Sequence, residues 1–174
     1  MLLPPGPSSL LRTARLDLVP ATLAHIEAEL RSPCAIGELL GIEVPEGWPP
    51  GEYDRDALAF FHDRLSAGGP AVQGWYSWYG MTRNAQGRRE TLVAGAGYFG
   101  PPDGGTVEIG YSVVPAYRNQ GYASEMVLAL VDRAFADPSV QQAIAHTSDA
   151  NRASTKVLLR CGFHRIGPEA GPDA

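Results

Sequence analysis

A short segment, Arg118-Asn119-Gln120-Gly121-Tyr122-Ala123, constrains this chain more than any other. It follows an apolar, strand-like run at 107–114 and precedes a helix-like run at 124–136, so the sequence predicts a strand, a glycine turn and a helix. The first N–H groups of a helix have no partner inside the helix, and the helix dipole places partial positive charge there. Gly121 lets an anion approach because it has no Cβ, and Arg118 adds a cation. We therefore predict that a pyrophosphate binds at residues 118–123.

Two common phosphate-binding motifs are absent from the sequence. There is no G-x-x-x-x-G-K-[ST], which argues against a P-loop NTPase, and no G-x-G-x-x-G after a first strand, which argues against a Rossmann dinucleotide site. The remaining pattern, R-x-x-G-x-A, is weak by itself, because a glycine turn before a helix is often only a turn. Its interpretation depends on the flanking residues.

Those flanking residues form two motifs. The stretch from Val107 to Glu125 contains E-I-G-Y and G-Y-A-S-E, and it resembles the acetyl-CoA-binding core of the GNAT N-acetyltransferases. Further along, the stretch from Asn151 to Phe163 contains N-R-A-S and C-G-F and resembles the closing motif of the same superfamily. The combination is most similar to the branch that acetylates protein N-termini, including ribosomal proteins (RimJ/RimL-like). The close match covers residues 92–167, under half of the chain.

Length and charge limit the class of protein. A chain of 174 residues fits one domain, and we expect residues 1–11 and 168–174 to be loose tails. The formal net charge of −5 argues against nucleic-acid binding, and no run of 18 apolar residues suggests a membrane span. The first residues lack the basic start of a signal peptide. Cys34 and Cys161 are too few for a disulfide framework, so we expect buried, reduced thiols and a cytoplasmic location.

Hydrophobic periodicity predicts an α+β fold. We expect helices at 22–31, 54–65, 124–136 and 153–160, and strands at 15–20, 73–82, 91–99, 107–114, 142–146 and 163–166. The resemblance implies a GNAT-like mixed, mostly antiparallel central sheet with helices on both faces. It also implies that the strands holding Val113 and His146 splay apart, and that acetyl-CoA lies in the opening.

The implied reaction is attack by an amine on the acetyl thioester of acetyl-CoA. The pyrophosphate would bind at residues 118–123, and the pantetheine arm would pair with the backbone of Tyr111 and Val113. Pro115 helps to keep that strand edge open, because proline cannot donate to a ladder. The backbone N–H of Val113 or Val114 is the candidate donor to the oxyanion.

Glu108 is the candidate general base. It is the one carboxylate in the predicted central strand, and it points toward the cleft if Val107 and Ile109 point into the core. Partial burial would raise its pKa toward neutral pH, and an ordered water can relay the proton. The alternative is a solvent-facing strand glutamate or a partner for an arginine. His146, which ends a predicted strand beside the cleft, is the histidine of most interest.

Asn151 and Ser154 form a second cluster. Three residues apart at a helix start, they share a face, and they also suit an N-cap pair. The resemblance implies that Asn151 contacts the pantetheine arm and that Ser154 lies near the thiol, as a catalytic candidate. Many relatives have a tyrosine that protonates the leaving thiolate at the position of Leu158, so here Ser154 or water would serve, or the thiolate leaves unprotonated. Arg160 is a candidate contact for the 3′-phosphate of CoA, although the helix dipole also favours arginine there.

The acceptor amine is the open question. A protein N-terminus is the first expectation, and a polyamine, an amino acid or an aminoglycoside is the alternative. A non-catalytic acetyl-CoA-binding module is a rival of another class. The loop 41–53 and Trp48, Trp75 and Trp78 are candidates to line the acceptor pocket. The four histidines show no metal-binding spacing, so no metal is expected, and a homodimer is a further possibility from the resemblance.

Overall fold

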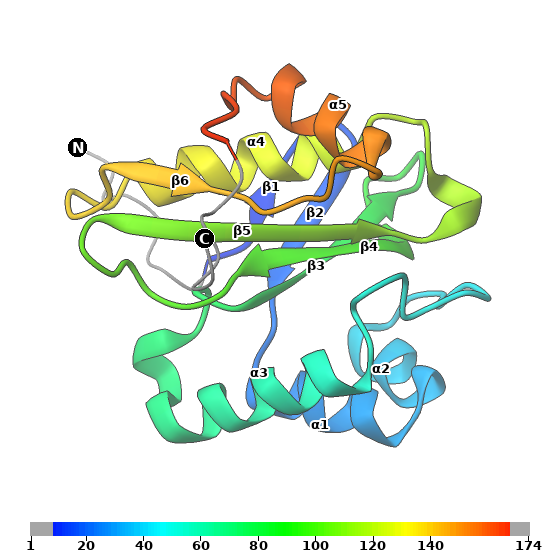
Figure 1. The fold of residues 1–174 in the computed structure, drawn as a ribbon. Coiled ribbons are helices and arrows are strands. Elements are labelled where there is room, and N and C mark those ends of the chain that lie inside the picture. Colours follow the sequence, from blue (N-terminus) through cyan, green and yellow to red (C-terminus); the bar gives the residue numbers. More distant parts are fainter. Residues whose placement is uncertain (1–8, 168–174) are drawn as a thin grey trace.

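The computed structural model describes residues 9–167, which form a curled sheet flanked by helices (Figure 1). Within this range the strand order is the chain order, β1 to β6, and neighbours are antiparallel except for the parallel pair β5–β6. The strands are β1 Leu11–Arg12, β2 Leu16–Pro20, β3 Ser77–Arg83, β4 Arg89–Tyr98, β5 Thr106–Val113 and β6 Gln142–Ile144. The prediction of a mixed, mostly antiparallel sheet is confirmed.

Helices cover both faces of the sheet, as predicted (Figure 1). One face is covered by α4 Tyr122–Phe135, with α5 Arg152–Arg160 beyond it, and the other by α1 Leu23–Arg31, α2 Pro33–Leu40 and α3 Arg55–Gly68. Local sequence explains where these helices begin. The side chains of Thr22 and Asp54 accept hydrogen bonds from the first turns of α1 and α3, and each replaces a partner that the helix cannot supply.

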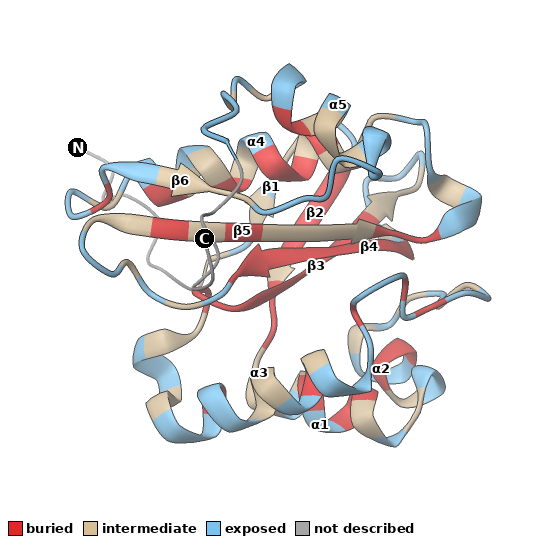
Figure 2. Ribbon diagram, in the orientation of Figure 1, coloured by how far each residue is buried: buried red, intermediate tan, exposed pale blue. Residues whose placement is uncertain are grey.

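The core therefore has two halves, and Figure 2 shows the buried residues concentrated in the sheet and on the inward sides of the helices. On the α4 side, fully buried Trp78, Met126 and Leu130 pack with side chains of β2, β4 and β5. On the α1–α3 side, fully buried Ile26 and Tyr79 pack around the loop that precedes α3. Along β3, the neighbours Trp78 and Tyr79 point to opposite halves, as successive residues of a strand do.

Four sequence-based expectations need correction. The strand predicted at 73–82 begins only at Ser77, because a 3₁₀ turn, Gly69–Val72, comes first. The strand predicted at 163–166 does not form. A helix, α2, follows α1 directly, because Ser32 ends α1 and its side chain also caps α2. Leu11 belongs to β1 rather than to a loose tail, whereas residues 1–8 and 168–174 lie outside the described residues.

The strands β5 and β6 splay apart. β5 pairs with β6 only from Thr106 to Glu108, opposite Gln142 to Ile144, but it continues along β4 as far as Val113. Among the described residues, no strand pairs with the second half of β5 on its β6 side. This opening lies directly before the turn that leads into α4.

Candidate active site

The turn that the sequence predicts as an anion-binding site leads from the end of β5 into α4. Asn119 and Gly121 have left-handed backbone conformations, with φ of 60° and 84°. The helix begins at Tyr122, two residues earlier than predicted, so Tyr122 and Ala123 contribute its first N–H groups. Gly121 is the N-cap and supplies no side-chain hydrogen bond to them.

This missing cap sets α4 apart. In the described range every other α-helix has a side-chain cap: Thr22 for α1, Ser32 for α2, Asp54 for α3 and Asn151 for α5. The first turn of α4 thus keeps N–H groups that an anion could satisfy, beside a residue without a Cβ. Gln120 and Arg118 are exposed on the same turn.

Arg118 is exposed, but one of its contacts ties it to β5. Its Nε donates to the carbonyl oxygen of Val113 at 3.0 Å, so its side chain folds back toward the end of β5. The guanidinium thus lies between the strand end and the turn. It brings a positive charge to both places at which an anionic cosubstrate would be held.

The open edge of β5 presents the backbone groups of alternate residues. The carbonyl of Glu108 and the N–H of Val114 bond toward β4, to Phe99 and to Val93. Because these directions alternate along an antiparallel strand, the backbone groups of Tyr111 and Val113 point away from β4, toward the opening. This is the geometry expected for a pantetheine arm that pairs as a strand does. The N–H of Val114 is occupied, which leaves that of Val113 as the candidate oxyanion donor.

Glu108 points away from the α4-side core, as the alternation predicted, because buried Val107 and Ile109 point into it. Its Oε1 lies 2.9 Å from Nδ1 of His146, which follows β6 by two residues. The side chains of Glu108 and His146 are 33% and 53% exposed, so water reaches both. The structure therefore joins the candidate base to the histidine of most interest, at the point where the strands part.

Ser154 is linked to β5 through a hydroxyl pair. The Tyr111 hydroxyl lies 2.8 Å from Ser154 Oγ and donates to the Ser154 carbonyl at 3.2 Å. Burial raises the pKa of Tyr111 above its ordinary value of 10.0, so the phenol keeps its proton at neutral pH. Sequence reasoning chose Tyr111 for its backbone alone and missed this side-chain contact, because it joins residues 43 positions apart.

The start of α5 confirms one of the two interpretations of Asn151. Its Oδ1 accepts a hydrogen bond from the N–H of Ser154 at 3.1 Å, so Asn151 is the N-cap of α5. Asn151 is also exposed, and its contact with the pantetheine arm stays a prediction. Leu158, which stands where many relatives have tyrosine, is buried at 7% exposure. No hydroxyl or titratable group is available at that position.

The C-terminal end of α5 lies against the first turn of α4. Cys161 Sγ lies 3.6 Å from the carbonyl oxygen of Ser124, and the preceding residue, Arg160, is exposed at the end of α5. This proximity places Arg160 at the same end of α4 as the anion-binding turn. Cys161 is half-buried, but Cys34 is exposed, which corrects the expectation of two buried thiols.

The aromatic candidates for an acceptor pocket divide between the two faces. Trp75 and Trp78 belong to the α4-side core, so the prediction that they line the acceptor pocket together with Trp48 is wrong. Trp48 lies on the opposite face, in the loop before α3, and its Nε1 donates to the buried carboxylate of Glu29 at 2.7 Å. The same loop contacts β5, because a Cβ added at Gly51 would lie 2.7 Å from Ser112 Oγ.

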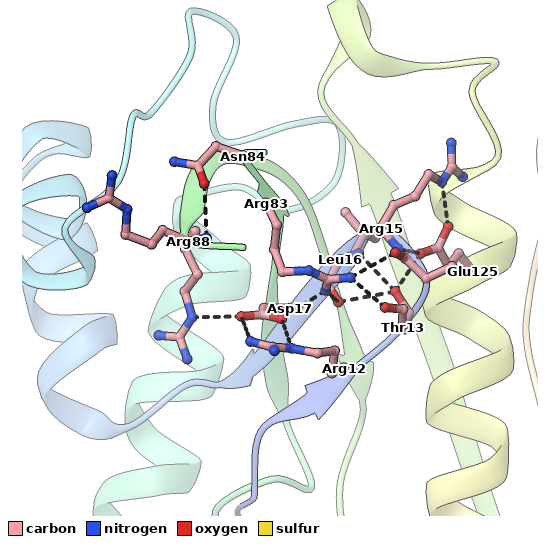
Figure 3. Close-up of polar contacts among 11 residues, drawn as sticks. Arg12, Thr13, Arg15, Leu16, Asp17, Arg83, Asn84, Arg88 and Glu125 are labelled. Atoms are coloured by element: carbon pink, nitrogen blue, oxygen red, sulfur yellow. Dashed lines mark hydrogen bonds and ion pairs between the residues drawn. The ribbon is translucent and has the colours of Figure 1, made fainter. Parts of the chain in front are cut away.

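Sequence reasoning also missed Arg15. This residue precedes β2, yet its guanidinium contacts Glu125, the acidic residue in the first turn of α4 (Figure 3). It also contacts the carbonyl of Gln120 in the turn before that helix. No local motif marks such a contact, because the partners are more than one hundred positions apart.

The described residues contain no cluster of three or more histidines, cysteines, aspartates or glutamates placed to hold a metal ion. Nor does any helix in this part of the chain have the length and apolar character needed to cross a membrane. The site is therefore defined by an uncapped helix, an open strand edge and a carboxylate–imidazole pair.

A curled, mostly antiparallel sheet with helices on both faces and a parallel β5–β6 pair is the fold of the GNAT acetyltransferases. The chain belongs to the GNAT family: the model of the Acetyltransferase (GNAT) domain matches residues 15–164. This match covers the turn, β5, α5 and the region of Arg15 together.

Individual proteins that match the chain over most of its length have low sequence identity to it. The chain is 28% identical over 158 residues to the FsC-acetyl coenzyme A-N(2)-transacetylase of Aspergillus fumigatus, which covers 90% of this chain and 65% of that protein. Across the curated relatives that it matches, the chain spans between 34% and 65% of their length.

Solved structures share the fold at low identity. The chain superposes on Mycobacterium smegmatis RimJ in complex with CoA-disulfide with a TM-score of 0.59 and 19% identity, covering 93% of this chain and 78% of that one. It superposes on AAC(6′)-Ib in complex with ribostamycin and coenzyme A with a TM-score of 0.57 and 21% identity, covering 91% and 88%. These likenesses establish a common fold.

Proposed function

We propose that this chain is a single-domain, acetyl-CoA-dependent N-acetyltransferase that moves an acetyl group to a primary amine by direct attack. The observation that carries the proposal is the uncapped N-terminus of α4 at Gly121, which lies next to the open edge of β5. The residues fit acetyl-CoA, because no side chain caps the first N–H groups of α4, which a diphosphate can then satisfy, and Gly121 takes the left-handed conformation that leads into the helix. Family membership supports the same cosubstrate.

In this account each part of acetyl-CoA has its own contacts. The N–H groups of residues 119–123 hold the diphosphate. The backbone of Tyr111 and Val113 aligns the pantetheine arm, with the exposed amide of Asn151 beside it. Arg160 takes the 3′-phosphate, and the contact between Cys161 and Ser124 supports this role by fixing the end of α5 near the turn.

Glu108 and His146 prepare the acceptor. The amine arrives as an ammonium ion and must lose one proton before its lone pair can attack the acetyl carbon. Glu108 accepts this proton directly or through water, and its hydrogen bond to His146 fixes its orientation and offers a path to solvent. The partial exposure of both side chains supports such a path.

Val113, Ser154 and Tyr111 serve the second half of the reaction. The N–H of Val113 stabilises the negative charge that develops on the acetyl oxygen. When the carbon–sulfur bond breaks, the electron pair remains on sulfur, and Ser154 Oγ donates a hydrogen bond or a proton to the thiolate. A proton that Ser154 gives up is balanced by the second proton that the nitrogen loses as the amide forms, carried by water, while the hydroxyl of Tyr111, 2.8 Å from Ser154 Oγ, holds the serine in place.

The first acceptor class that we propose is a protein N-terminus, on the resemblance of the E-I-G-Y and G-Y-A-S-E motifs. A small-molecule amine is the second, because the Aspergillus relative is named for N(2)-transacetylation of FsC and AAC(6′)-Ib was solved with ribostamycin. Trp48 and the loop around Gly51 would line the acceptor side of β5. We place the reaction in the cytoplasm, where Cys34 and Cys161 stay reduced.

The test is the release of free CoA thiol from acetyl-CoA in the presence of a panel of amines. The panel contains peptides with varied N-terminal residues, the same peptides with blocked N-termini, polyamines, amino acids and aminoglycosides. Turnover on at least one acceptor, with mass spectrometry locating the acetyl group on nitrogen, supports the proposal. Binding of acetyl-CoA without turnover on any amine would favour the non-catalytic module instead.

A further inference from the structure

Arg15 connects β2 to both sides of Gly121. Its Nη1 donates to the carbonyl oxygen of Gln120 at 2.7 Å, and its guanidinium carbon lies 4.5 Å from the centre of the Tyr122 ring. Its Nε donates to Glu125 Oε2 at 2.8 Å, and its backbone N–H donates to Glu125 Oε1 at 2.7 Å. One side chain thus contacts the residue before the N-cap, the residue after it, and the first turn of α4.

The guanidinium also covers the open side of the N-cap. A Cβ added at Gly121 would lie 3.2 Å from Arg15 Nη2. The turn that Arg15 contacts has two left-handed residues, Asn119 and Gly121, and asparagine and glycine are the residue types that adopt this conformation most readily. The contacts of Arg15 reach this turn from the residue that precedes β2 and add to what holds it in place.

Glu125 is the anchor of this arrangement. Thr13 Oγ1 donates to Glu125 Oε1 at 2.5 Å, beside the two bonds from Arg15 (Figure 3). Burial raises the pKa of Glu125, but these hydrogen bonds and the charge of Arg15 bring it below its ordinary value, so the carboxylate is charged at neutral pH. A charged carboxylate in the first turn of α4 would repel a diphosphate unless a cation neutralised it.

We propose that Arg15 is a positioning residue for diphosphate binding. Its bonds to Glu125 and to the Gln120 carbonyl hold the turn in the form that presents the N–H groups of α4, and its charge offsets that of Glu125. This inference rests on the proposed function, because it assumes that acetyl-CoA binds at this turn. The proposal assigns a role in cosubstrate binding to Arg15, the residue directly before β2. This residue lies outside the sequence motifs of β5, α4 and α5.

The test is calorimetric titration of CoA into the wild type and into Arg15→Ala, Arg15→Lys and Arg12→Ala. Arg12→Ala is the matched control, because Arg12 lies on the same hairpin but pairs with Asp17 rather than with the turn. We expect Arg15→Ala and Arg15→Lys to weaken CoA binding by about ten- to a hundredfold, and Arg12→Ala to bind as the wild type does. A lysine keeps the charge but cannot bond Glu125 and the Gln120 carbonyl in the same fork-like manner.

Hydrogen exchange in the absence of ligand supplies a second measurement. The amides of Gly121 and Tyr122 should exchange faster in Arg15→Lys, the variant that best preserves folding, while those of β3 stay protected. Equal CoA affinity in the wild type and both Arg15 variants, full rescue by lysine, or an equal loss in Arg12→Ala would each overturn this inference while leaving the proposed function intact. A wild-type protein that binds no CoA would overturn both.

Discussion

Glu108 Oε1 and His146 Nδ1 lie 2.9 Å apart, and their hydrogen bond spans the point at which β5 and β6 separate. Glu108 is the last residue of β5 that pairs with β6, opposite Ile144. The pair is partly exposed, so an acceptor amine and water can both reach it. Its position next to the open strand edge is the basis for assigning proton removal to this site.

Replacing Glu108 by glutamine keeps the shape of the side chain but removes its capacity to accept a proton. We expect kcat at neutral pH to fall by about 10²–10⁴, the range typical of a lost general base, while KM for acetyl-CoA changes little. Steady-state kinetics with any accepted amine measures both constants. Glu90→Gln, an exposed glutamate of β4, is the control. Unchanged kcat in Glu108→Gln would remove this residue from the mechanism.

A double-mutant cycle tests whether Glu108 and His146 act as one unit. His146→Ala should lower kcat by about tenfold, because a charge-assisted hydrogen bond to the base is lost. In the double variant with Glu108→Gln, kcat should be no lower than in Glu108→Gln alone, since the histidine acts through the carboxylate. Losses that multiply would show instead that the two residues act independently.

The hydroxyl pair of Tyr111 and Ser154 should matter for departure of the thiolate. Ser154→Ala should lower kcat by about ten- to a hundredfold, the effect of losing a hydrogen bond to a charged group, and Tyr111→Phe should lower it less. Thr155→Val, one position further along α5, is a control for changes in this helix. If Ser154→Ala leaves kcat unchanged, the thiolate leaves without help from this pair.

A buried ion cluster makes stability depend on pH. Asp17 is 1% exposed and pairs with Arg12 and Arg83 (Figure 3). It also pairs with Arg89. Burial raises the pKa of Asp17, but the bonds from these arginines bring it below its ordinary value of 3.8. Since the folded-state pKa is the lower one, the stability that this group contributes is present above the unfolded-state pKa and is lost as pH falls through the folded-state pKa.

Asp17→Asn should therefore destabilise the protein by about 1–3 kcal/mol at pH ~7, because it removes the charged acceptor that three partly exposed arginines share. Urea unfolding at neutral and at acidic pH measures the free energy of unfolding. The difference from wild type should shrink as the pH falls below about 4. Asp132→Asn, on an exposed position of α4, should show neither effect. A constant difference at all pH values would contradict this assignment.

Local signals made much of the fold and the anion-binding turn predictable. A glycine before an amphipathic run specifies a turn and a helix start over a few residues, and Asp54 and Thr22 cap the helices that their positions predicted. The alternation of β5 likewise predicted which way Glu108 points. In each case neighbours in the sequence determine the outcome.

Other features depend on contacts that sequence periodicity does not encode. Ser32 ends α1 and also caps α2, so one residue separates two helices, and the pattern that predicted the helix at 22–31 gave no sign of the second. In a uniform strand over 73–82, Trp75 and Trp78 would point to opposite faces, because they are three positions apart. Instead Trp75 precedes β3, and both side chains join the α4-side core. Arg15 meets Gln120 and Glu125 only after β2 has packed beside α4.

Calorimetric titration of acetyl-CoA into wild type and Gly121→Glu tests the central claim most directly. We predict a dissociation constant in the micromolar range for the wild type and no detectable binding for Gly121→Glu, because the new side chain blocks the turn and repels the diphosphate. Gly87→Glu, at a hairpin glycine with a similar φ of 75°, should bind like the wild type. Absence of binding by the wild type, or equal affinity in Gly121→Glu, would contradict the account.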